Sequence, residues 1–284
     1  MRPRLVFDAA FAAAALCACL APAHAEVTGT RKLEDSVRVT GGKPPVVIVK
    51  NIFGSIHVTA HDRDTVDMTA TETIHGDLQA DIDQARAEVE LRTQSEDGRV
   101  AFRVRRVGAD GDCDCNRWDG YRVEYAIEVR VPRDAAVEVA TVNDGDIVIE
   151  GVHGNFEVRN VNGGVRLAGL RGAGHISTVN GPVEARFERA PTAATSFKTI
   201  NGKIEVAFPE NLAADLEFTT MHGQIYTDFD VEPFVRAPVS ERTRDDGRLV
   251  VRTQRASAMR VAGGGPEYSF ETLNGSVYIR KAQR

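Results

Sequence analysis

The octapeptide TINGKIEV at residues 199–206 is repeated along the chain with small changes. Close copies read TVNGPVEA at 178–185, TMHGQIYT at 220–227 and TLNGSVYI at 272–279. Each copy joins a Thr-x-Asn-Gly segment, or a close variant of it, to a stretch in which apolar and polar residues alternate. Alternation with a period of two predicts a strand with one buried face, and Asn-Gly is typical of a tight turn. The repeat therefore predicts one turn-and-strand unit several times over.

The glycines that precede these strands are regularly spaced, with five of them at intervals of nine residues between Gly145 and Gly181. Nine residues hold one strand and one turn, and the motif keeps its orientation, so an array of hairpins fits poorly. Stacked coils of about 18 residues, each made of two such units, fit better. We expect positive φ angles at Gly163, Gly181 and Gly202. The glycines assigned to structural turns are Gly145, Gly154, Gly163, Gly181, Gly202, Gly223 and Gly275.

The sequence therefore predicts an all-β fold, a β-solenoid-like stack of repeated Asn-Gly rungs that forms two packed sheets. A meandering antiparallel sandwich is the alternative. Asn162, Asn180 and Asn201 are expected to stack as a ladder at one corner of the coils. One continuous core is expected to contain Ile147, Phe156, Val165, Val183 and Ile204.

Residues 26–284 are predicted to form a single β-repeat domain, with irregular strands to about residue 135 and regular rungs over 136–284. The irregular part contains at most one short helix, near residues 79–88, where Asp81 and Asp83 favour a helix start. A hairpin turn is expected at Glu96-Asp97-Gly98.

The first 25 residues, 1–25, have the features of a secretory signal peptide. Arg2 and Arg4 precede a short apolar run, and alanines occupy the cleavage-site positions before Glu26. The run is shorter than the ~20 residues that span a bilayer, so no transmembrane segment is expected in the mature chain. Lipidation at Cys19 is an alternative fate of the same segment. The mature protein is therefore expected to be exported, to the periplasm or the cell envelope.

The chain of 284 residues carries a formal net charge of −6. Cleavage before Glu26 removes two arginines and one aspartate, so the charge becomes −7. An acidic chain with scattered lysines and arginines lacks the basic footprint of a nucleic-acid-binding protein.

Long stretches of the chain resemble the bacterial putative-adhesin β-strand-repeat family, exported domains related to the head domains of putative autotransporter adhesins. The resemblance is carried by IEVRVPRDAAVEVATVNDGDIVIEGVHGNFEVRNVNGGVRLAG at 127–169, by TINGKIEVAFPENLAADLEFTTMHGQIYT at 199–227 and by GGGPEYSFETLNGSVYIRK at 263–281. It covers roughly residues 45–284 and implies a β-solenoid-like fold at the cell envelope. The family has no site motif, so the resemblance assigns no functional residue.

The segment DGDCDCNRWDGY at 110–121 is the one chemically dense stretch of the chain. Asp110, Asp112 and Asp114 alternate, as oxygen ligands of calcium do, although the loop lacks the glycine and glutamate of a helix-loop-helix calcium site. A solvated polar loop is the alternative. Cys113 and Cys115 could close a small disulfide ring in an oxidising compartment.

No catalytic motif stands out, and no cofactor site is expected. The favoured hypothesis is a non-enzymatic envelope protein that acts as a binding, adhesion or structural scaffold. Its partner would be an envelope protein, a glycan or a cell-wall component. The rival hypothesis is a carbohydrate-active β-helix enzyme of the periplasm, which needs carboxylates that converge on one cleft. Its candidate carboxylates include Asp144, Asp146 and Glu205.

Overall fold

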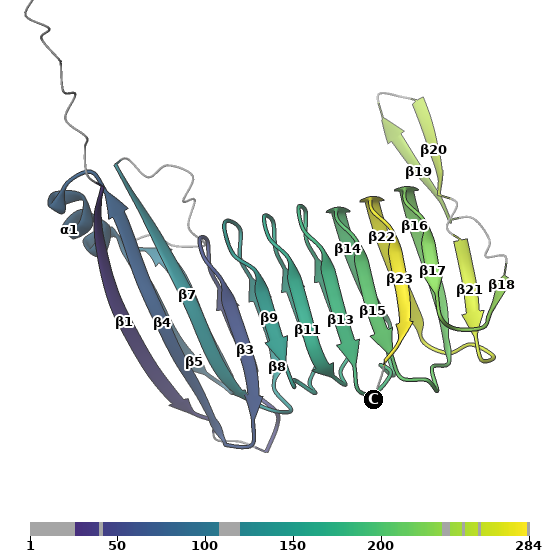
Figure 1. Cartoon of the computed structure of the whole chain (residues 1–284), viewed down its shortest axis with the longest axis horizontal. Helices are drawn as coiled ribbons and strands as arrows, with labels where there is room; N and C mark the ends of the chain where they lie inside the picture. The colour runs from purple at the N-terminus through teal and green to yellow at the C-terminus, as the bar shows by residue number, and fades with distance from the viewer. Residues whose placement is uncertain are drawn as a thin grey trace, which may run out of the picture.

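Two large β-sheets packed face to face make up most of the protein (Figure 1). The computed structural model describes residues 26–39, 42–107, 120–234, 239–245, 248–254 and 257–282, the side chains of 234–256 excepted. Both sheets are mixed, and neither closes into a barrel. One helix, α1 (Gln79–Glu88), occurs in the described chain, where the sequence predicts it.

Sheet A has ten strands and sheet B has eleven. The strands of sheet A, in spatial order, are β1 (Val27–Arg38), β4 (Thr65–Gly76), β7 (Tyr121–Pro132), β3 (Ile56–His61), β9 (Ile147–Glu150), β11 (Val165–Leu170), β13 (Val183–Phe187), β15 (Ile204–Phe208), β23 (Val277–Lys281) and β17 (Ile225–Thr227). Those of sheet B are β18 (Val231–Phe234), β21 (Ser257–Val261), β16 (Ala214–His222), β22 (Glu267–Asn274), β14 (Thr195–Asn201), β12 (Gly174–Ser177), β10 (Phe156–Arg159), β8 (Ala136–Ala140), β2 (Val46–Lys50), β6 (Arg99–Arg106) and β5 (Val89–Glu96).

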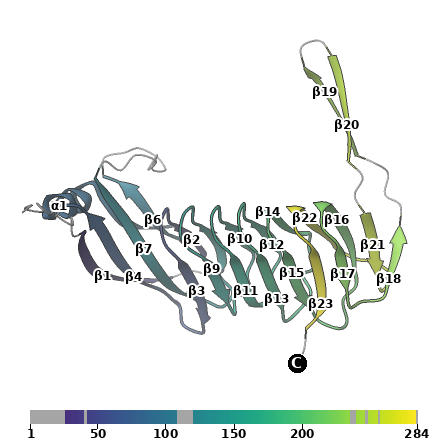
Figure 2. The ribbon, with the colours of Figure 1, turned by 45° about the horizontal axis from the view of Figure 1, so that its top comes forward.

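Consecutive strands from β8 to β15 alternate between the two sheets, and each pairs in parallel with the strand two elements later. Val165 is therefore in register with Ile147 on one side and with Val183 on the other. Hairpin pairing, which the antiparallel alternative requires, does not occur between these strands. Figure 2 shows the resulting stack of turns along the long axis of the molecule.

The core runs without interruption between the sheets and contains all five residues assigned to it from the sequence. Side chains at equal positions of neighbouring turns stack on one another. The rings of Phe197 and Phe270 lie 5.0 Å apart between centroids, and those of Phe218 and Phe270 lie 5.1 Å apart. This is close to the about 4.8 Å between neighbouring strands, so the aromatic side chains follow the backbone spacing.

The first turn of the stack, β2 and β3, is separated from the rest in sequence. Ile56 pairs in register with Ile147, and Val47 with Val137. The intervening chain forms β4, α1, the β5–β6 hairpin and β7, which extend both sheets at the N-terminal end. Asp97 and Gly98 make the hairpin turn with φ angles of 48° and 75°, at the place predicted for it.

The C-terminal turn is placed out of sequence order. Strand β22 lies between β14 and β16, and β23 lies between β15 and β17. The chain from β17 to β22 includes β18, β21 and a third, two-stranded sheet of β19 (Val239–Asp245) and β20 (Arg248–Gln254), which projects from the body in Figure 1.

Candidate binding surface

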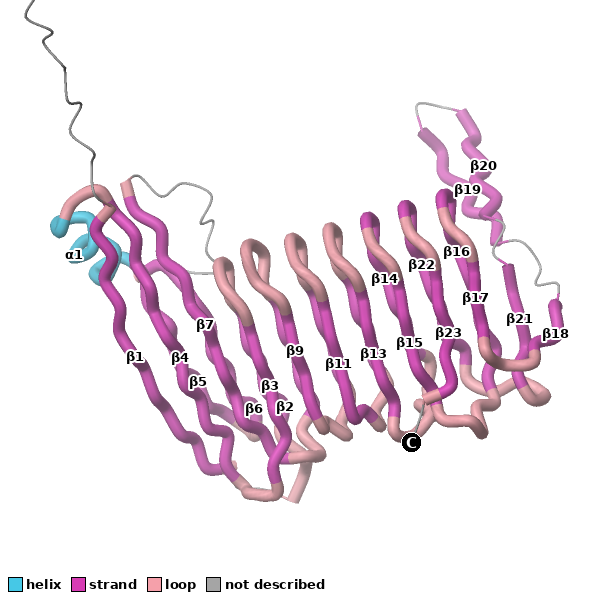
Figure 3. The backbone as a smooth tube through the Cα atoms, in the orientation of Figure 1, coloured by secondary structure: helices cyan, strands magenta, loops and turns pink. Residues whose placement is uncertain are grey.

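Every turn of the stack passes from sheet B to sheet A through a segment like Thr-x-Asn-Gly. These segments form a row of loops along one edge of the molecule (Figure 3). Seven of them follow β2, β8, β10, β12, β14, β22 and β16. Each of the four positions in the segment has its own environment.

The first position satisfies a buried carbonyl group. The Thr178 hydroxyl donates to the Gly163 carbonyl oxygen over 2.9 Å, and the Thr199 hydroxyl donates to that of Gly181 over 3.0 Å. Both threonines are buried. In two turns asparagine replaces threonine: the Asn160 amide donates to the Gly145 carbonyl oxygen over 2.9 Å, and the Asn51 amide donates to the Gly54 carbonyl oxygen over 3.1 Å. A buried carbonyl group without such a donor would destabilise the fold, so this side chain serves the scaffold.

The third position forms a ladder of amide groups. The Asn180 side chain donates to Asn162 Oδ1 over 2.9 Å, Asn201 donates to Asn180 over 2.8 Å, and Asn274 donates to Asn201 over 2.7 Å. Asn162 donates in turn to Asn143. Asparagine therefore recurs because each amide is both donor and acceptor to the neighbouring turns.

The fourth position needs glycine because the backbones approach closely. A Cβ atom at Gly181 would overlap the carbonyl oxygen of Gly163, and one at Gly202 would overlap that of Gly181. The prediction of positive φ at Gly163, Gly181 and Gly202 is wrong, since none of them lies in the left-handed region. The missing side chain, rather than an unusual dihedral, is what these turns require. Backbone carbonyl groups are approached in the same way at Gly145, Gly154, Gly223 and Gly275.

The second position is apolar in every turn, and apart from Ile52, which packs against the core, its side chain lies outside the core. We call this row the apolar ridge, and it consists of Ile52, Val142, Val161, Val179, Ile200, Leu273 and Met221. Four of its members are exposed, with fractions of 39% for Val142, 37% for Ile200, 39% for Leu273 and 71% for Met221. The scaffold does not need the other six side chains to be apolar, because only Ile52 of this row packs against the core.

Other exposed apolar side chains lie at the same edge. Val107 follows β6, which runs parallel to β2, and Leu78 follows β4, which ends where the neighbouring β7 begins. Of the large apolar side chains that are exposed in the described chain, only Tyr226 is outside this edge, on the outer face of sheet A. Exposed apolar surface is therefore concentrated along one side of the molecule.

A row of positive side chains runs along the outer face of sheet B, two residues before the ridge on the strands that lead into it, and continues past the end of the ridge onto β6 and β5. We call it the cationic row. Strand register places Arg92 beside Arg103, Arg103 beside Lys50, and Arg159 and Lys198 further along the same line, with Ala140 and Ser177 at the intervening places. Glu271 and Thr219 continue the line at the C-terminal end.

Part of this positive charge is balanced nearby. Lys50 Nζ lies 3.6 Å from a Glu138 carboxylate oxygen, Lys198 Nζ lies 2.9 Å from Glu271, and Arg159 pairs with Glu157. Within the described chain, no carboxylate lies within ion-pair distance of Arg92 or Arg103, and the buried Nε of Arg103 has no hydrogen-bond acceptor. The N-terminal half of the row therefore keeps a net positive charge.

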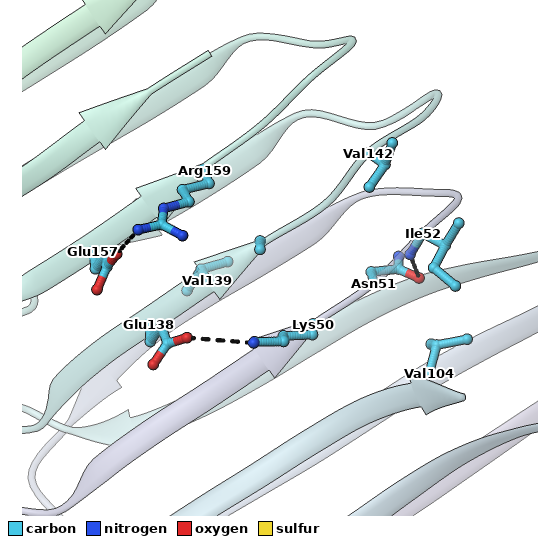
Figure 4. Close-up of a pocket in the computed structure, with 10 residues that line it drawn as sticks. Lys50, Asn51, Ile52, Val104, Glu138, Val139, Val142, Glu157 and Arg159 are labelled. Carbon is cyan, nitrogen blue, oxygen red and sulfur yellow. Dashed lines mark hydrogen bonds and ion pairs between the residues drawn. The ribbon is translucent and has the colours of Figure 1, made fainter. Parts of the chain in front are cut away.

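A shallow hollow of about 220 Å³ lies where the ridge and the cationic row meet near β2. Figure 4 shows two ion pairs, Lys50–Glu138 and Arg159–Glu157, on one side of it. Ile52, Val104 and Val142 lie on the other side. The hollow thus has a charged and an apolar wall.

His175 lies one row further from the ridge, between Glu157 and Ser196 in register. Its Nδ1 contacts the Ser196 hydroxyl. Burial lowers the pKa of His175 below its usual value, and the nearby positive charge of Arg159 lowers it further. The neutral ring is therefore the favoured form in the folded protein.

The other residues singled out from the sequence do not form a site in the described structure. Asp110, Asp112, Asp114, Cys113 and Cys115 lie outside the described residues, so the calcium site and the disulfide stay predictions. In the described ranges, no three His, Cys, Asp or Glu side chains are grouped as a metal ion requires.

The carboxylates of the enzyme hypothesis each have a structural contact. Asp144 accepts a hydrogen bond from Arg122 over 2.6 Å, Asp146 accepts one from the backbone N–H of Gly164 over 2.7 Å, and Glu205 pairs with Lys203 over 2.9 Å. Asp146 borders a small hollow that contains neither of the other two.

No protein-family model and no curated protein sequence matches the chain. Among solved structures, it is similar to a putative cell adhesion protein from Clostridium sporogenes, with 10% identity over 89% of this chain and 100% of that one and a TM-score of 0.41. It is similar to a putative adhesin from Bacteroides fragilis, with 12% identity, 89% and 97% coverage and a TM-score of 0.38. A putative lipid binding protein from Parabacteroides distasonis has 9% identity, 89% and 97% coverage and a TM-score of 0.24.

Two of these descriptions name adhesion, as does the family that the sequence resembles. No helix in the described part of the chain is long and apolar enough to cross a membrane.

Proposed function

We propose that the protein is an exported, non-enzymatic component of the cell envelope that works as a binding scaffold. Its β-solenoid-like stack of Asn-Gly rungs, residues 136–284 together with the β2–β3 turn, holds a rigid surface, and the apolar ridge is the part of that surface that binds. The single observation that carries this proposal is the contrast within Thr-x-Asn-Gly. Three positions are fixed by contacts inside the scaffold, while the second is apolar in seven turns and, in all of them except Ile52, lies outside the core.

An exposed aliphatic side chain orders water and adds an aggregation hazard, and a serine or lysine would fit the same outward position. An unbroken apolar line is therefore expected only where something covers it. The surface that covers it would be an envelope component, in keeping with the leader-like residues 1–25.

Co-sedimentation with a purified envelope fraction tests the proposal. The protein is expected to bind, and the Val142→Ser/Ile200→Ser/Leu273→Ser variant is expected to lose most of that binding. Tyr226→Ser is the matched control, because it removes an exposed apolar side chain from the other sheet. Equal binding by the ridge variant and the control would contradict the proposal.

The non-enzymatic part has its own test. The protein is expected to leave a panel of polysaccharides intact. Turnover that disappears in an Asp144→Ala, Asp146→Ala or Glu205→Ala variant would contradict it and favour the carbohydrate-active alternative.

A further inference from the structure

Two rows of side chains lie next to each other on sheet B with different chemistry. The outer one is the apolar ridge at the edge of the molecule, and the inner one is the cationic row. On the strands that lead into the ridge, the two rows are separated by two residues, which is about 7 Å, and the cationic row continues beyond the ridge on β6 and β5. This pairing is unusual for a chain whose net charge is −6.

The geometry points to an anionic lipid bilayer surface as the partner of this edge. The inference rests on the proposed function and names the partner that the ridge would bind. The apolar ridge enters the boundary between headgroups and acyl chains, and the cationic row lies at the depth of the lipid phosphates. An interfacial apolar face is typically buried by about 5–10 Å, which matches the separation of the two rows.

Charge complementarity selects this partner over a second copy of the chain. Two copies that met at this edge would bring their cationic rows together and repel one another, whereas the same row attracts lipid phosphates. Arg92 and Arg103 face each other directly across β5 and β6, and no carboxylate in the described structure pairs with them. Phosphate oxygens would supply the acceptors that these two guanidinium groups lack.

The shape of the edge fits the same partner. The ridge lies on protruding turns and is straight, because every turn has the same register. A single line of side chains is narrower than the ≈ 800 Å² per partner of a standard protein interface. A bilayer can close around a protruding line, and Val107 and Leu78 extend the apolar edge beyond the stack.

Lipid vesicles test the inference directly. The purified protein, expressed with its own leader, is expected to co-sediment with vesicles of phosphatidylglycerol and phosphatidylcholine in equal parts. It is expected to bind vesicles of phosphatidylcholine alone much more weakly, and added salt should release it.

Two sets of variants separate the contributions of the two rows. Arg92→Gln/Arg103→Gln is expected to weaken binding roughly 25-fold, at about fivefold for each cation. Lys43→Gln/Arg63→Gln is the matched control, because it removes the same charge at the opposite edge, before β2 and after β3. Ile200→Ser/Leu273→Ser is expected to abolish binding, and Met221→Ser, at the most exposed ridge position, is a second test that spares the fold.

Three outcomes would overturn the inference. The first is no binding to the anionic vesicles, and the second is equal binding by the ridge or Arg92/Arg103 variants and the control. The third is a dimer that forms without lipid and is lost in the ridge variants, measured by sedimentation equilibrium. If the ridge variants fail to bind the envelope fraction although the protein ignores the vesicles, the proposed function stands and only the lipid partner is wrong. If those variants bind both as the unmodified protein does, both proposals fail.

Discussion

The outer faces of the two sheets have the same backbone spacing but carry different arrangements of charged and apolar side chains. On sheet A, opposite charges pair with one another: Lys203 lies 2.9 Å from both Glu184 and Glu205, and Arg166 lies 3.2 Å from Glu184. On sheet B, several positive side chains share one row beside the apolar ridge, and Lys50, Arg159 and Lys198 of that row pair with glutamates. Sheet A thus pairs these charges internally, whereas sheet B leaves the apolar ridge and the adjacent Arg92 and Arg103 for a partner.

The regular spacing of the strands alone therefore does not determine which side chains the surface carries. Both faces inherit the same spacing of about 4.8 Å, and outward positions on either face tolerate most side chains. The separate apolar and cationic rows on sheet B are therefore a property of the sequence. Variants can test whether these rows can be changed without loss of stability.

The largest effect is expected at the lattice that both faces share. Gly181→Val would force a side chain into the Gly163 backbone and should lower the free energy of unfolding by several kcal/mol, beyond the 1–3 typical of overpacking. Chemical denaturation measures it. Gly42→Val is the control, because no atom lies within 4 Å of a Cβ there. Similar stability of the two variants would show that the close approach is not needed.

A smaller effect is expected at the first position of the corner segment. Thr199→Val removes the donor to the Gly181 carbonyl group and should cost about 1–3 kcal/mol in the free energy of unfolding, while Thr199→Ser should retain most of it. Ile200→Ser, one residue further along, should change stability little. In combination with Leu273→Ser it should abolish binding to the anionic vesicles. A large loss of stability in Ile200→Ser would break the separation between scaffold and surface.

Removal of one positive side chain is expected to change the free energy of unfolding in opposite directions on the two faces. Lys203→Met on sheet A should destabilise by up to about 1 kcal/mol, because it leaves two carboxylates together. Arg103→Gln on sheet B should stabilise by about 0.2–1 kcal/mol, because it ends the opposition to Arg92. Thermal denaturation of the two single variants checks this. Destabilisation by Arg103→Gln would mean that sheet B is as well balanced as sheet A.

The smallest effect is a pH dependence of sheet B. Since the folded-state pKa of His175 lies below the ordinary 6.5, its contribution to stability is present above pH 6.5 and is lost as the pH falls through the folded-state value. The free energy of unfolding should therefore decrease below pH 6.5, and His175→Gln should flatten this slope. An unchanged slope in His175→Gln would assign the pH dependence elsewhere.

Much of the scaffold could be predicted from the sequence because its signals are local. The alternation after each glycine, the asparagine at the third position and the helix near residues 79–88 all lie within short stretches. The second position is apolar in every Thr-x-Asn-Gly copy, so the sequence also contains the signal for the ridge: a turn position that is always apolar.

The remaining features depend on contacts between distant segments. The cationic row joins Arg92, Lys50 and Lys198, which no spacing rule connects. The positions of the glycines could be predicted, but not the reason for them. The sequence shows that a side chain is absent but not the neighbouring carbonyl oxygen that excludes it. The place of β22–β23 was equally hidden, since every unit carries the same motif and any of them could follow β14–β15 in register.

That displaced unit has a consequence for the order of folding. Residues 267–281 are synthesised after β16 and β17, yet they lie between those strands and the preceding turn. During synthesis, the growing stack therefore reaches β15 and then has an open edge, because β16 and β17 pair with it only through the later strands β22 and β23. The late segment therefore completes the stack: a nascent chain interrupted before residue 267 keeps an edge of unpaired backbone N–H and C=O groups, which is a template for pairing with other chains.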